Sequence, residues 1–345
     1  MDVYTVNPLS DPRWHRLVGE HPKASVFHQC GWVRALLTTY GYEPLALTTS
    51  PPDEPLRSGV IFCRVSSWIT GSRLVSLPFS DHCDPLVDEN AEDVLIGRLL
   101  QMSEQQNCKY LEIRPLGSLD EKRVGMTESG TFCFHMLDLR DDLPQIFRRL
   151  HKDSIQRKIH RAEREGLVCE VGNSDRLVNE FYRLLIQTRK RHRMLPQPLA
   201  WIKNLVAFMG DALQIRVARQ SGTPVAAMLS LRHRNTVIYK YGCSDERKHN
   251  LGSVPFLFWN LIRESKAQGA EQLDLGRSDW DQPSLILFKD RLGAAKRSLS
   301  YLRSKDSSKA TRVTALASHI PHAGFSIVPN VILSAAGRLA YRHLG

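Results

Sequence analysis

The fold is decided by residues 236–276, TVIYKYGCSDERKHNLGSVPFLFWNLIRESKAQGAEQLDLG. The first nine residues alternate polar and apolar side chains, which is typical of a half-buried β-strand. A helix is predicted after Gly252, with Ser253 as its N-cap, one apolar stripe along its length, and Gly269 at its end. EQLDLG then forms a second short strand. The sequence therefore predicts a strand–helix–strand unit with a right-handed crossover.

The start of that helix is a candidate anion site, with Gly252 and Ser253 at its tip. Its unpaired N–H groups and the positive end of the helix dipole favour a phosphate or a carboxylate. Water is the alternative occupant, because most helix starts beside a glycine bind nothing else.

The composition is that of an ordinary globular protein. The 345 residues exceed the usual size of one domain, so two domains are expected. A hydrophobic content of 42% and a charged content of 24% argue against a disordered or fibrous chain. The sequence has no long apolar window and its first residues lack the pattern of a signal peptide, so we expect a cytoplasmic location. Seven scattered cysteines without a Cys-x-x-Cys pair indicate neither a disulfide framework nor a zinc ribbon.

The net charge of +11 favours polyanionic partners: RNA, nucleotide phosphates or an anionic membrane surface. Basic residues are dense in a predicted helix around residues 154–166, where they recur at helical spacing beside an apolar face: Arg157, Lys158, Arg161 and Arg164. A solvated surface with no partner is the alternative interpretation of this basic helix.

The two halves of the chain share an order of elements: a run of strands, one helix, then two more strands. Such an order predicts α/β or α+β domains with mixed sheets. We place the first domain at residues 1–141, the second at 142–305, and an amphipathic tail at 306–345. The tail helix has an apolar side that could lie on an anionic membrane or dock on the protein: Val331, Ile332, Ala335 and Leu339.

Charged side chains gather after the second strand, in GRSDWDQPSLILFKDRLGAAKRSLSYL (residues 276–302). We interpret this stretch as a basic loop past the carboxyl end of a strand, where open sheets bind ligands. Lys289 follows four apolar residues, so it either points into a cleft as a fixed positive charge or lies at the surface. FSDHCDP (residues 79–85) carries ligand-type side chains but has no second ligand cluster, so no metal site is expected.

Three runs resemble the FemAB-like branch of the GNAT acyltransferases, which includes the peptidoglycan bridge aminoacyltransferases: SIQRKIHRAEREGL (154–167), FHQCGWVRAL (27–36) and FKDRLGA (288–294). The resemblance is strongest from Leu150 to Arg303. It implies two tandem GNAT-like domains with an active cleft between them, the second being BioF2-like. The tail resembles the ends of FemAB-like proteins associated with exopolysaccharide and PEP-CTERM protein-sorting systems.

In the bridge-forming members, a Phe-Lys pair before a glycine-containing turn places a lysine at the reaction site. Phe288 and Lys289 match that pair, which implies that Lys289 stabilises developing negative charge. Arg277 is expected to assist it, and Asp279 to orient or deprotonate an attacking amine. The resemblance and the helix tip together suggest these substrate-binding residues: Phe288, Tyr241, Asp81, His82, Gly252 and Ser253.

The expected activity is acyl or aminoacyl transfer, forming an amide on an amino-bearing cell-envelope precursor of peptidoglycan or exopolysaccharide type. No tightly bound cofactor is expected, and aminoacyl-tRNA or acyl-CoA would be the co-substrate. Residues 249–254, HNLGSV, keep only the middle glycine of the acetyl-CoA loop, and the long helical hairpin of some bridge-forming members is missing.

The expected partners are a lipid-linked sugar or another anionic acceptor, tRNA, and the inner face of a membrane through the tail. Two alternatives stay open. One is an acyl-CoA-dependent N-acyltransferase acting on a small amine. The other is a non-catalytic adaptor that binds RNA or a membrane.

Overall fold

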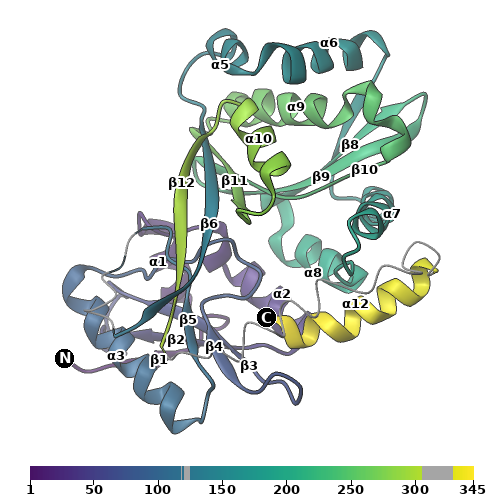
Figure 1. Ribbon diagram of the computed structural model, residues 1–345. Helices are drawn as coiled ribbons and strands as arrows, with labels where there is room; N and C mark the ends of the chain where they lie inside the picture. Colours follow the sequence, from purple (N-terminus) through teal and green to yellow (C-terminus); the bar gives the residue numbers. More distant parts are fainter. Residues whose placement is uncertain (118, 120–124, 305–328) are drawn as a thin grey trace. The chain divides into compact units, whose positions relative to one another are not determined.

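The computed structural model describes residues 1–117, 119, 125–304 and 329–345 (Figure 1). The described chain divides into two compact units. The first takes its described residues from 1–131, 299–304 and 336–345, and the second from 132–298 and 329–335. The chain thus enters the second unit before the expected boundary at residue 141, and it returns to the first unit at residue 299.

The first unit contains a mixed sheet in which only β4 and β5 are parallel among the described strand pairs. The strands lie in the order β1 (Tyr4–Val6), β2 (Glu43–Thr48), β3 (Val60–Val65), β4 (Arg73–Val75), β5 (Leu111–Ile113) and β12 (Ala295–Arg303). The described helices of this unit include α1 (Pro12–Glu20), η1 (Val26–His28), α2 (Cys30–Tyr40) and α3 (Glu89–Gln105). Leu95 and Leu99 of α3 join Leu74 and Leu111 of the sheet in a buried core.

Glu112 is the buried charged centre of the first unit. The residue is 3% exposed. Its carboxylate oxygens lie 2.8 Å from a guanidinium nitrogen of Arg114 and 2.6 Å from one of Arg303. Burial would raise the pKa of Glu112, but the two guanidinium groups outweigh it and hold the pKa below its usual value. The ion pair with Arg303 therefore joins β5 to β12.

The second unit contains a sheet whose strands are antiparallel except for the pair β10 and β11. Their order is β6 (Thr127–Asp138), β11 (Gln272–Ser278), β10 (Thr236–Ser244), β9 (Thr223–His233), β8 (Leu213–Gln220) and β7 (Val168–Gly172). The predicted strand–helix–strand unit is present, because β10 and β11 are parallel and α9 (Ser253–Ala267) connects them. The mixed α/β fold expected from the sequence is confirmed.

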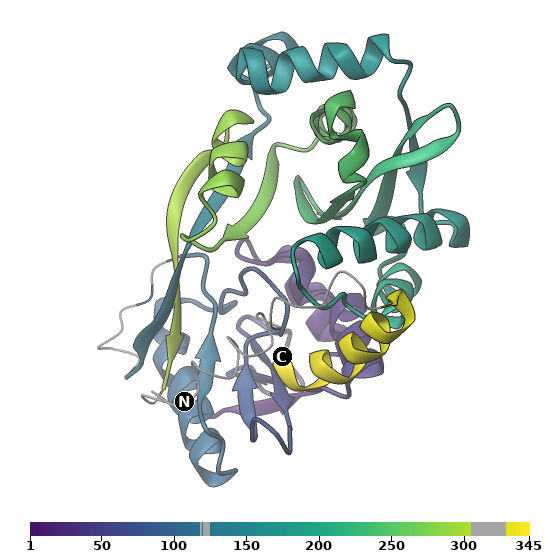
Figure 2. The ribbon, with the colours of Figure 1, turned by 45° about the vertical axis from the view of Figure 1, so that its right-hand side comes forward.

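Helices cover both faces of the second sheet (Figures 1 and 2). On one side, α9 packs on the strands and contacts the basic helix α6 (Arg157–Arg164). On the other side lie α7 (Asp175–Arg191) and α8 (Leu199–Met209). The remaining helical elements are α5 (Leu143–Arg149), the π-turn η2 (Lys152–Gln156), η3 (Gly210–Ala212), η4 (Glu246–Leu251) and α10 (Pro283–Arg291).

The start of α9 differs by one residue from the prediction. Gly252, not Ser253, is the N-cap, and it adopts the left-handed conformation with φ of 75°. A Cβ atom at residue 252 would lie 2.3 Å from the carbonyl oxygen of Lys158. Only glycine therefore allows the tip of α9 to approach the backbone of α6 so closely. The predicted stop at Gly269 is confirmed, with φ of 79° just after the C-cap.

The prediction of a basic loop after β11 is wrong, because residues 283–291 form the helix α10. Pro283 occupies the first helical position, where its fixed φ is favourable and its missing N–H costs nothing. The helix ends before Gly293, which has φ of 78°. Lys289 therefore projects from a helix.

The tail ends in the helix α12 (Asn330–Leu344), as predicted, whereas residues 306–328 of the expected tail lie outside the described residues. The predicted apolar side of α12 is exposed, and Leu333 and Gly337 are its buried residues. None of the helices in the described ranges is long and apolar enough to cross a bilayer.

Candidate active site

Strands β10 and β11 pair along only part of their length. Their described register covers residues 236–238 of β10 and 272–274 of β11. Beyond it, β10 shifts register against β9 between Tyr239 and Tyr241, and β11 shifts register against β6 between Asp274 and Arg277. The Asp274 side chain accepts a hydrogen bond of 2.6 Å from the N–H of Gly276, which has φ of 69°. These two bulges end the pairing of the strands.

A cavity of ≈ 330 Å³ lies in the second unit, and the strand β10 contributes to its wall after the pairing ends. Apolar side chains from β9, β10, α9 and α10 line it: Ala227, Met228, Tyr239, Leu257, Phe258, Leu285 and Phe288. Basic and imidazole groups also line it: Lys158, Arg191, His192, His249 and Lys289. Among the described residues, none that lines this cavity is an aspartate or a glutamate. The cavity is therefore apolar with a positive bias.

Lys289 is buried in the wall of the cavity, with 3% of its surface exposed. Its Nζ donates hydrogen bonds to the carbonyl oxygens of Gly276, at 3.0 Å, and Arg277, at 3.2 Å. The bulge in β11 thus supplies backbone acceptors that fix the ammonium group. The sequence allowed Lys289 to point into a cleft or to lie at the surface. In the structure it is buried and lines the cavity.

The neighbouring residue Asp290 is held from two other strands. His135 of β6 lies 3.2 Å from its carboxylate, and Lys296 of β12 donates to it at 3.1 Å. Burial would raise the pKa of Asp290, but these two hydrogen bonds outweigh it and lower the pKa. Burial lowers the pKa of His135, despite the opposing hydrogen bond to Asp290. These contacts fix the end of α10 that carries Lys289.

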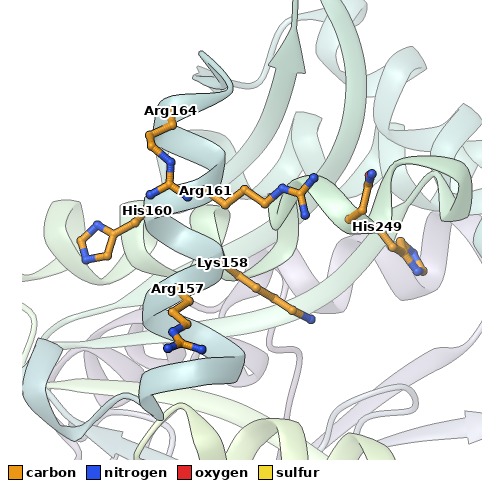
Figure 3. A pocket seen from close by; sticks show the side chains of 7 residues that line it. Arg157, Lys158, His160, Arg161, Arg164 and His249 are labelled. Carbon is orange, nitrogen blue, oxygen red and sulfur yellow. The ribbon is translucent and has the colours of Figure 1, made fainter.

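A second, basic pocket of ≈ 640 Å³ lies between α6 and the segment before α9 (Figure 3). It is lined by Arg157, Lys158, His160, Arg161, Arg164, His249 and Asn250. Lys158 and Arg161 extend from α6 towards the segment that carries His249, whereas His160 points away from it. Lys158 and His249 also line the first cavity, so the two hollows adjoin there.

The charges of the basic pocket are only partly balanced. Arg157 pairs with Asp153 at 3.0 Å and Arg161 approaches Glu165 at 3.7 Å, both on the exposed helix surface. Within the part of the chain that the structure describes, Lys158 forms no ion pair. Exposed pairs of this kind stabilise little, so the pocket remains attractive to phosphate groups.

Two histidines and a cysteine of the cavity favour their neutral forms. Burial, reinforced by the charge of Arg191, lowers the pKa of both His192 and His249. The Nε2 of His249 lies 2.9 Å from the Ser244 hydroxyl. Burial raises the pKa of the Cys243 thiol, so this residue is a poor nucleophile at neutral pH. Neutral imidazoles at both sites can accept a proton.

The predicted substrate-binding residues of the second unit are only partly brought together. Ser253 and Phe288 line the cavity, and Gly252 caps the adjoining helix. Tyr241 is absent from the lining, and its hydroxyl accepts a hydrogen bond of 3.0 Å from Trp201 of α8. The register shift before Tyr241 changes which face of β10 this side chain occupies.

Arg277 and Asp279 lie at the surface near the end of β11. The guanidinium of Arg277 stacks over the ring of Phe132 at 4.0 Å, and it lies 3.7 Å from the carboxylate of Asp279. Neither side chain lines the cavity. Arg277 contributes through its carbonyl group, which holds Lys289.

Asp81 and His82 belong to the first unit. The carbonyl oxygen of Asp81 accepts a hydrogen bond of 2.7 Å from the Tyr301 hydroxyl. The His82 side chain is buried and meets the ring of Phe27 edge-on, with 5.4 Å between centroids. In the described ranges, no group of three or more His, Cys, Asp or Glu side chains is arranged to hold a metal ion.

Several lining residues were not predicted from the sequence, notably Arg191, His192, Met228 and Tyr239. The basic end of α7, residues 189–191, was the sequence signal for Arg191 and His192, and such a run is equally typical of a helix C-terminus. Their proximity to Lys289 arises from sheet topology, which no local pattern encodes.

Comparisons with known proteins agree with this geometry. A family model described as "Acetyltransferase (GNAT) domain" matches residues 149–282, which include both hollows except for the end of the cavity formed by α10. The UDP-N-acetylmuramoylpentapeptide-lysine N(6)-alanyltransferase of Weissella viridescens is 25% identical over 144 residues, which are 41% of this chain and 42% of that protein. The match thus spans less than half of the curated relative.

Two solved structures show the same fold. The crystal structure of FemX has a TM-score of 0.71 at 11% identity, covering 92% of this chain and 100% of FemX. The C-terminal domain of a putative lysylphosphatidylglycerol synthetase from Agrobacterium fabrum has a TM-score of 0.59 at 13% identity, covering 88% and 94%. Because the likeness to FemX extends over both units, the fold is a tandem GNAT fold. Residues 149–282 therefore match a GNAT acetyltransferase domain, and the fold of the chain is similar to that of FemX.

Proposed function

We propose that the second unit binds an acyl donor, with the acyl group in the apolar cavity and phosphate groups in the basic pocket. The acyl group is then transferred to an amine of a cell-envelope precursor, of peptidoglycan or exopolysaccharide type, to form an amide. The observation that carries this proposal is the buried ammonium of Lys289 in the wall of a cavity that adjoins a phosphate-attracting pocket. The alanyltransferase relative supports an amine as the acceptor.

The proposed reaction uses the groups of the cavity in distinct roles. The acceptor amine attacks the carbonyl carbon of the donor, and negative charge develops on the carbonyl oxygen. Lys289 stabilises that oxyanion, because its charge is already fixed by backbone carbonyls and need not reorganise. The amine loses a proton to the neutral imidazole of His249, which lines the cavity, and not to Asp279, which lies outside it. The ester or thioester bond then breaks, the imidazolium returns the proton to the departing oxygen or sulfur, and free tRNA or coenzyme A leaves.

The donor is proposed from the charge of the two hollows. A basic pocket beside the cavity suits either the phosphates of aminoacyl-tRNA or the pyrophosphate of acyl-CoA. A free α-ammonium group would find no carboxylate among the described residues that line the cavity. This lining favours a donor whose acyl group is uncharged, and it supports the acyl-CoA-dependent reading as the second candidate.

Matched ligands distinguish the two donors. We expect the protein to be stabilised against heat by propionyl-CoA if coenzyme A is the carrier, since a ligand at a hundredfold excess over its Kd adds about 2.7 kcal/mol. We expect alanyl-tRNA, but not an unrelated RNA of equal length, to stabilise it if tRNA is the carrier. If neither propionyl-CoA nor alanyl-tRNA stabilises the protein, the proposed donor site is refuted.

The role of the basic pocket is tested with Lys158→Ala and Arg161→Ala, separately and together. Each removed phosphate contact should weaken donor binding and reduce the slope of log K against log salt by about 1. Arg263→Ala is the matched control, because Arg263 is an exposed arginine on α9 that lines neither hollow. Equal losses in the control and the pocket variants would contradict the assignment.

The role of Lys289 is tested by transfer of a labelled acyl group to UDP-N-acetylmuramoyl pentapeptide or to a cell-envelope extract. Lys289→Met, once shown to be folded, should lower transfer by about 10²–10³-fold while donor binding persists. Unchanged transfer would exclude the lysine from the reaction. Binding of RNA without transfer by the unaltered protein would instead support the adaptor alternative.

A further inference from the structure

Helix α12 presents one exposed apolar face. Val331 is 79% exposed, Ile332 57% and Leu339 68%. At about 100° per residue, these side chains and Ala335 fall within an arc of about 100° around the helix. Leu333 lies on the other side of the helix and is 2% exposed. The helix therefore contacts the protein with one side and leaves a separate apolar stripe in water.

The loop between β3 and β4 exposes two further large apolar side chains. Trp68 is 89% exposed and Ile69 is 53% exposed. With the three residues of α12, they make up five of the eleven large hydrophobic side chains that are exposed among the described residues. Isolated exposed apolar residues are ordinary, but an aromatic and an aliphatic side chain together at a loop tip are not explained by packing.

The loop is fixed to the end of α12 within the first unit. The hydroxyl of Ser67 lies 2.9 Å from Nδ1 of His343, and Thr70 donates to the His343 carbonyl oxygen at 3.2 Å. The Trp68 ring meets the His343 ring edge-on, with 5.8 Å between centroids. Leu339 precedes His343 by about one helical turn. The loop tip and the last turns of α12 therefore belong to one surface.

The charge of this surface is positive. Arg338 and Arg342 are exposed: Arg338 lies at one edge of the apolar stripe of α12, and Arg342 lies within the same arc in the last turn. Lys109 is also exposed, and its side chain lies against Gly71 of the loop. The helix α12, NVILSAAGRLAYRHL, contains no acidic residue. Apolar side chains bordered by arginine and lysine match a layer of hydrocarbon under anionic headgroups.

We propose that this surface, formed by Trp68, Ile69, Leu339, Arg338 and Arg342, binds the interface of an anionic lipid bilayer. Tryptophan sits favourably at the level of the headgroups, and a helix that carries arginines beside its apolar side chains lies in the plane of the interface. The charges select a bilayer over another apolar protein surface, because they would be buried without counter-charges against the latter. This inference does not require the transfer reaction proposed above.

The test is sedimentation of the full-length protein with vesicles of phosphatidylcholine alone or with about one third phosphatidylglycerol, an anionic fraction sufficient to attract juxtamembrane basic residues. The unaltered protein should bind the anionic vesicles and release them at high salt. The double variant Trp68→Ala/Ile69→Ser should bind them at least about tenfold more weakly, because it loses two inserting side chains. Arg338→Gln/Arg342→Gln should remove the preference for anionic lipid.

Trp280→Ala is the matched control, since Trp280 is a 51% exposed tryptophan of the second unit. It should leave vesicle binding unchanged. The proposal is overturned if the unaltered protein ignores anionic vesicles at low salt, or if the control weakens binding as much as the loop variant. It is also overturned if Lys158→Ala/Arg161→Ala abolishes vesicle binding while the loop variant does not, because lipid phosphates would then be bound by the basic pocket.

Discussion

Replacing Gly252 by alanine should separate the two hollows of the second unit. The new Cβ would lie 2.3 Å from the Lys158 carbonyl oxygen and 2.8 Å from its carbonyl carbon, both of them backbone atoms. Because the clashing atoms belong to the backbone of α6, rotating a side chain cannot relieve the clash. The helix α6 must therefore move away from α9. Lys158 would move with it, and that residue lines both hollows.

The expected cost has two parts. Alanine in the left-handed conformation lowers the free energy of unfolding by about 1 kcal/mol. This value allows for the smaller conformational entropy that alanine gives the unfolded chain. Crowding against fixed neighbours adds about 1–3 kcal/mol. Gly166→Ala isolates the first part, because Gly166 has φ of 69° and a Cβ there would meet nothing within 4 Å. At about 2–4 °C per kcal/mol, we expect a fall in Tm of about 2–4 °C for the control and about 5–15 °C for Gly252→Ala.

Thermal unfolding followed by circular dichroism measures both values, and a titration with the stabilising donor measures the effect on binding. Donor binding should weaken in Gly252→Ala and remain normal in Gly166→Ala. Equal falls in Tm for the two variants would refute the close approach of α6 and α9. A large fall with unaltered donor binding would refute the role given to Lys158.

Three further outcomes follow from buried polar groups. Lys289→Ala should lower the free energy of unfolding by about 2–4 kcal/mol, because two buried carbonyls lose their donor; an unchanged urea midpoint would contradict its burial. His135 has a lowered pKa, so the unfolded chain binds its proton more readily and stability should fall as the pH drops below about 6.5; His135→Gln should reduce that fall between pH 8 and pH 5.5. Glu112→Gln should cost about 3–5 kcal/mol, because two arginines lose their counter-charge, and a loss under 1 kcal/mol would argue against the ion pairs.

Much of the fold could be predicted because its signals are local. The alternation in residues 236–244 and the glycine at each end of α9 define a strand and a helix without any distant contact. The N-cap was misplaced by one residue because Ser253 is the better capping side chain, whereas the position demands glycine for its contact with Lys158. Residues 283–291 were misread as a loop because charged residues obscured the helix-starting Pro283.

The candidate site was predictable only where a motif pointed to it. Lys289 was predicted as a site residue from the short Phe288–Lys289 motif. Its buried position agrees with the apolar stretch that precedes it in the sequence. Tyr241 was among the expected substrate-binding residues, but it does not line the cavity, and the register of β10 shifts between Tyr239 and Tyr241. Arg191 and His192 reach the cavity from α7, and nothing in their own stretch of sequence encodes which strands they face.

The return of the chain to the first unit has a consequence for biosynthesis. Strand β5 pairs with β12 through Ile113 with Leu302 and Glu112 with Arg303, so its partner is translated roughly 190 residues later. At about 5–20 residues per second, the ribosome needs roughly 10–40 s to supply it. Throughout that interval the nascent chain carries an open strand edge and a carboxylate that still awaits one arginine. A chaperone that shields nascent β-edges should therefore raise the yield of this protein more than that of a chain whose sheet closes in order.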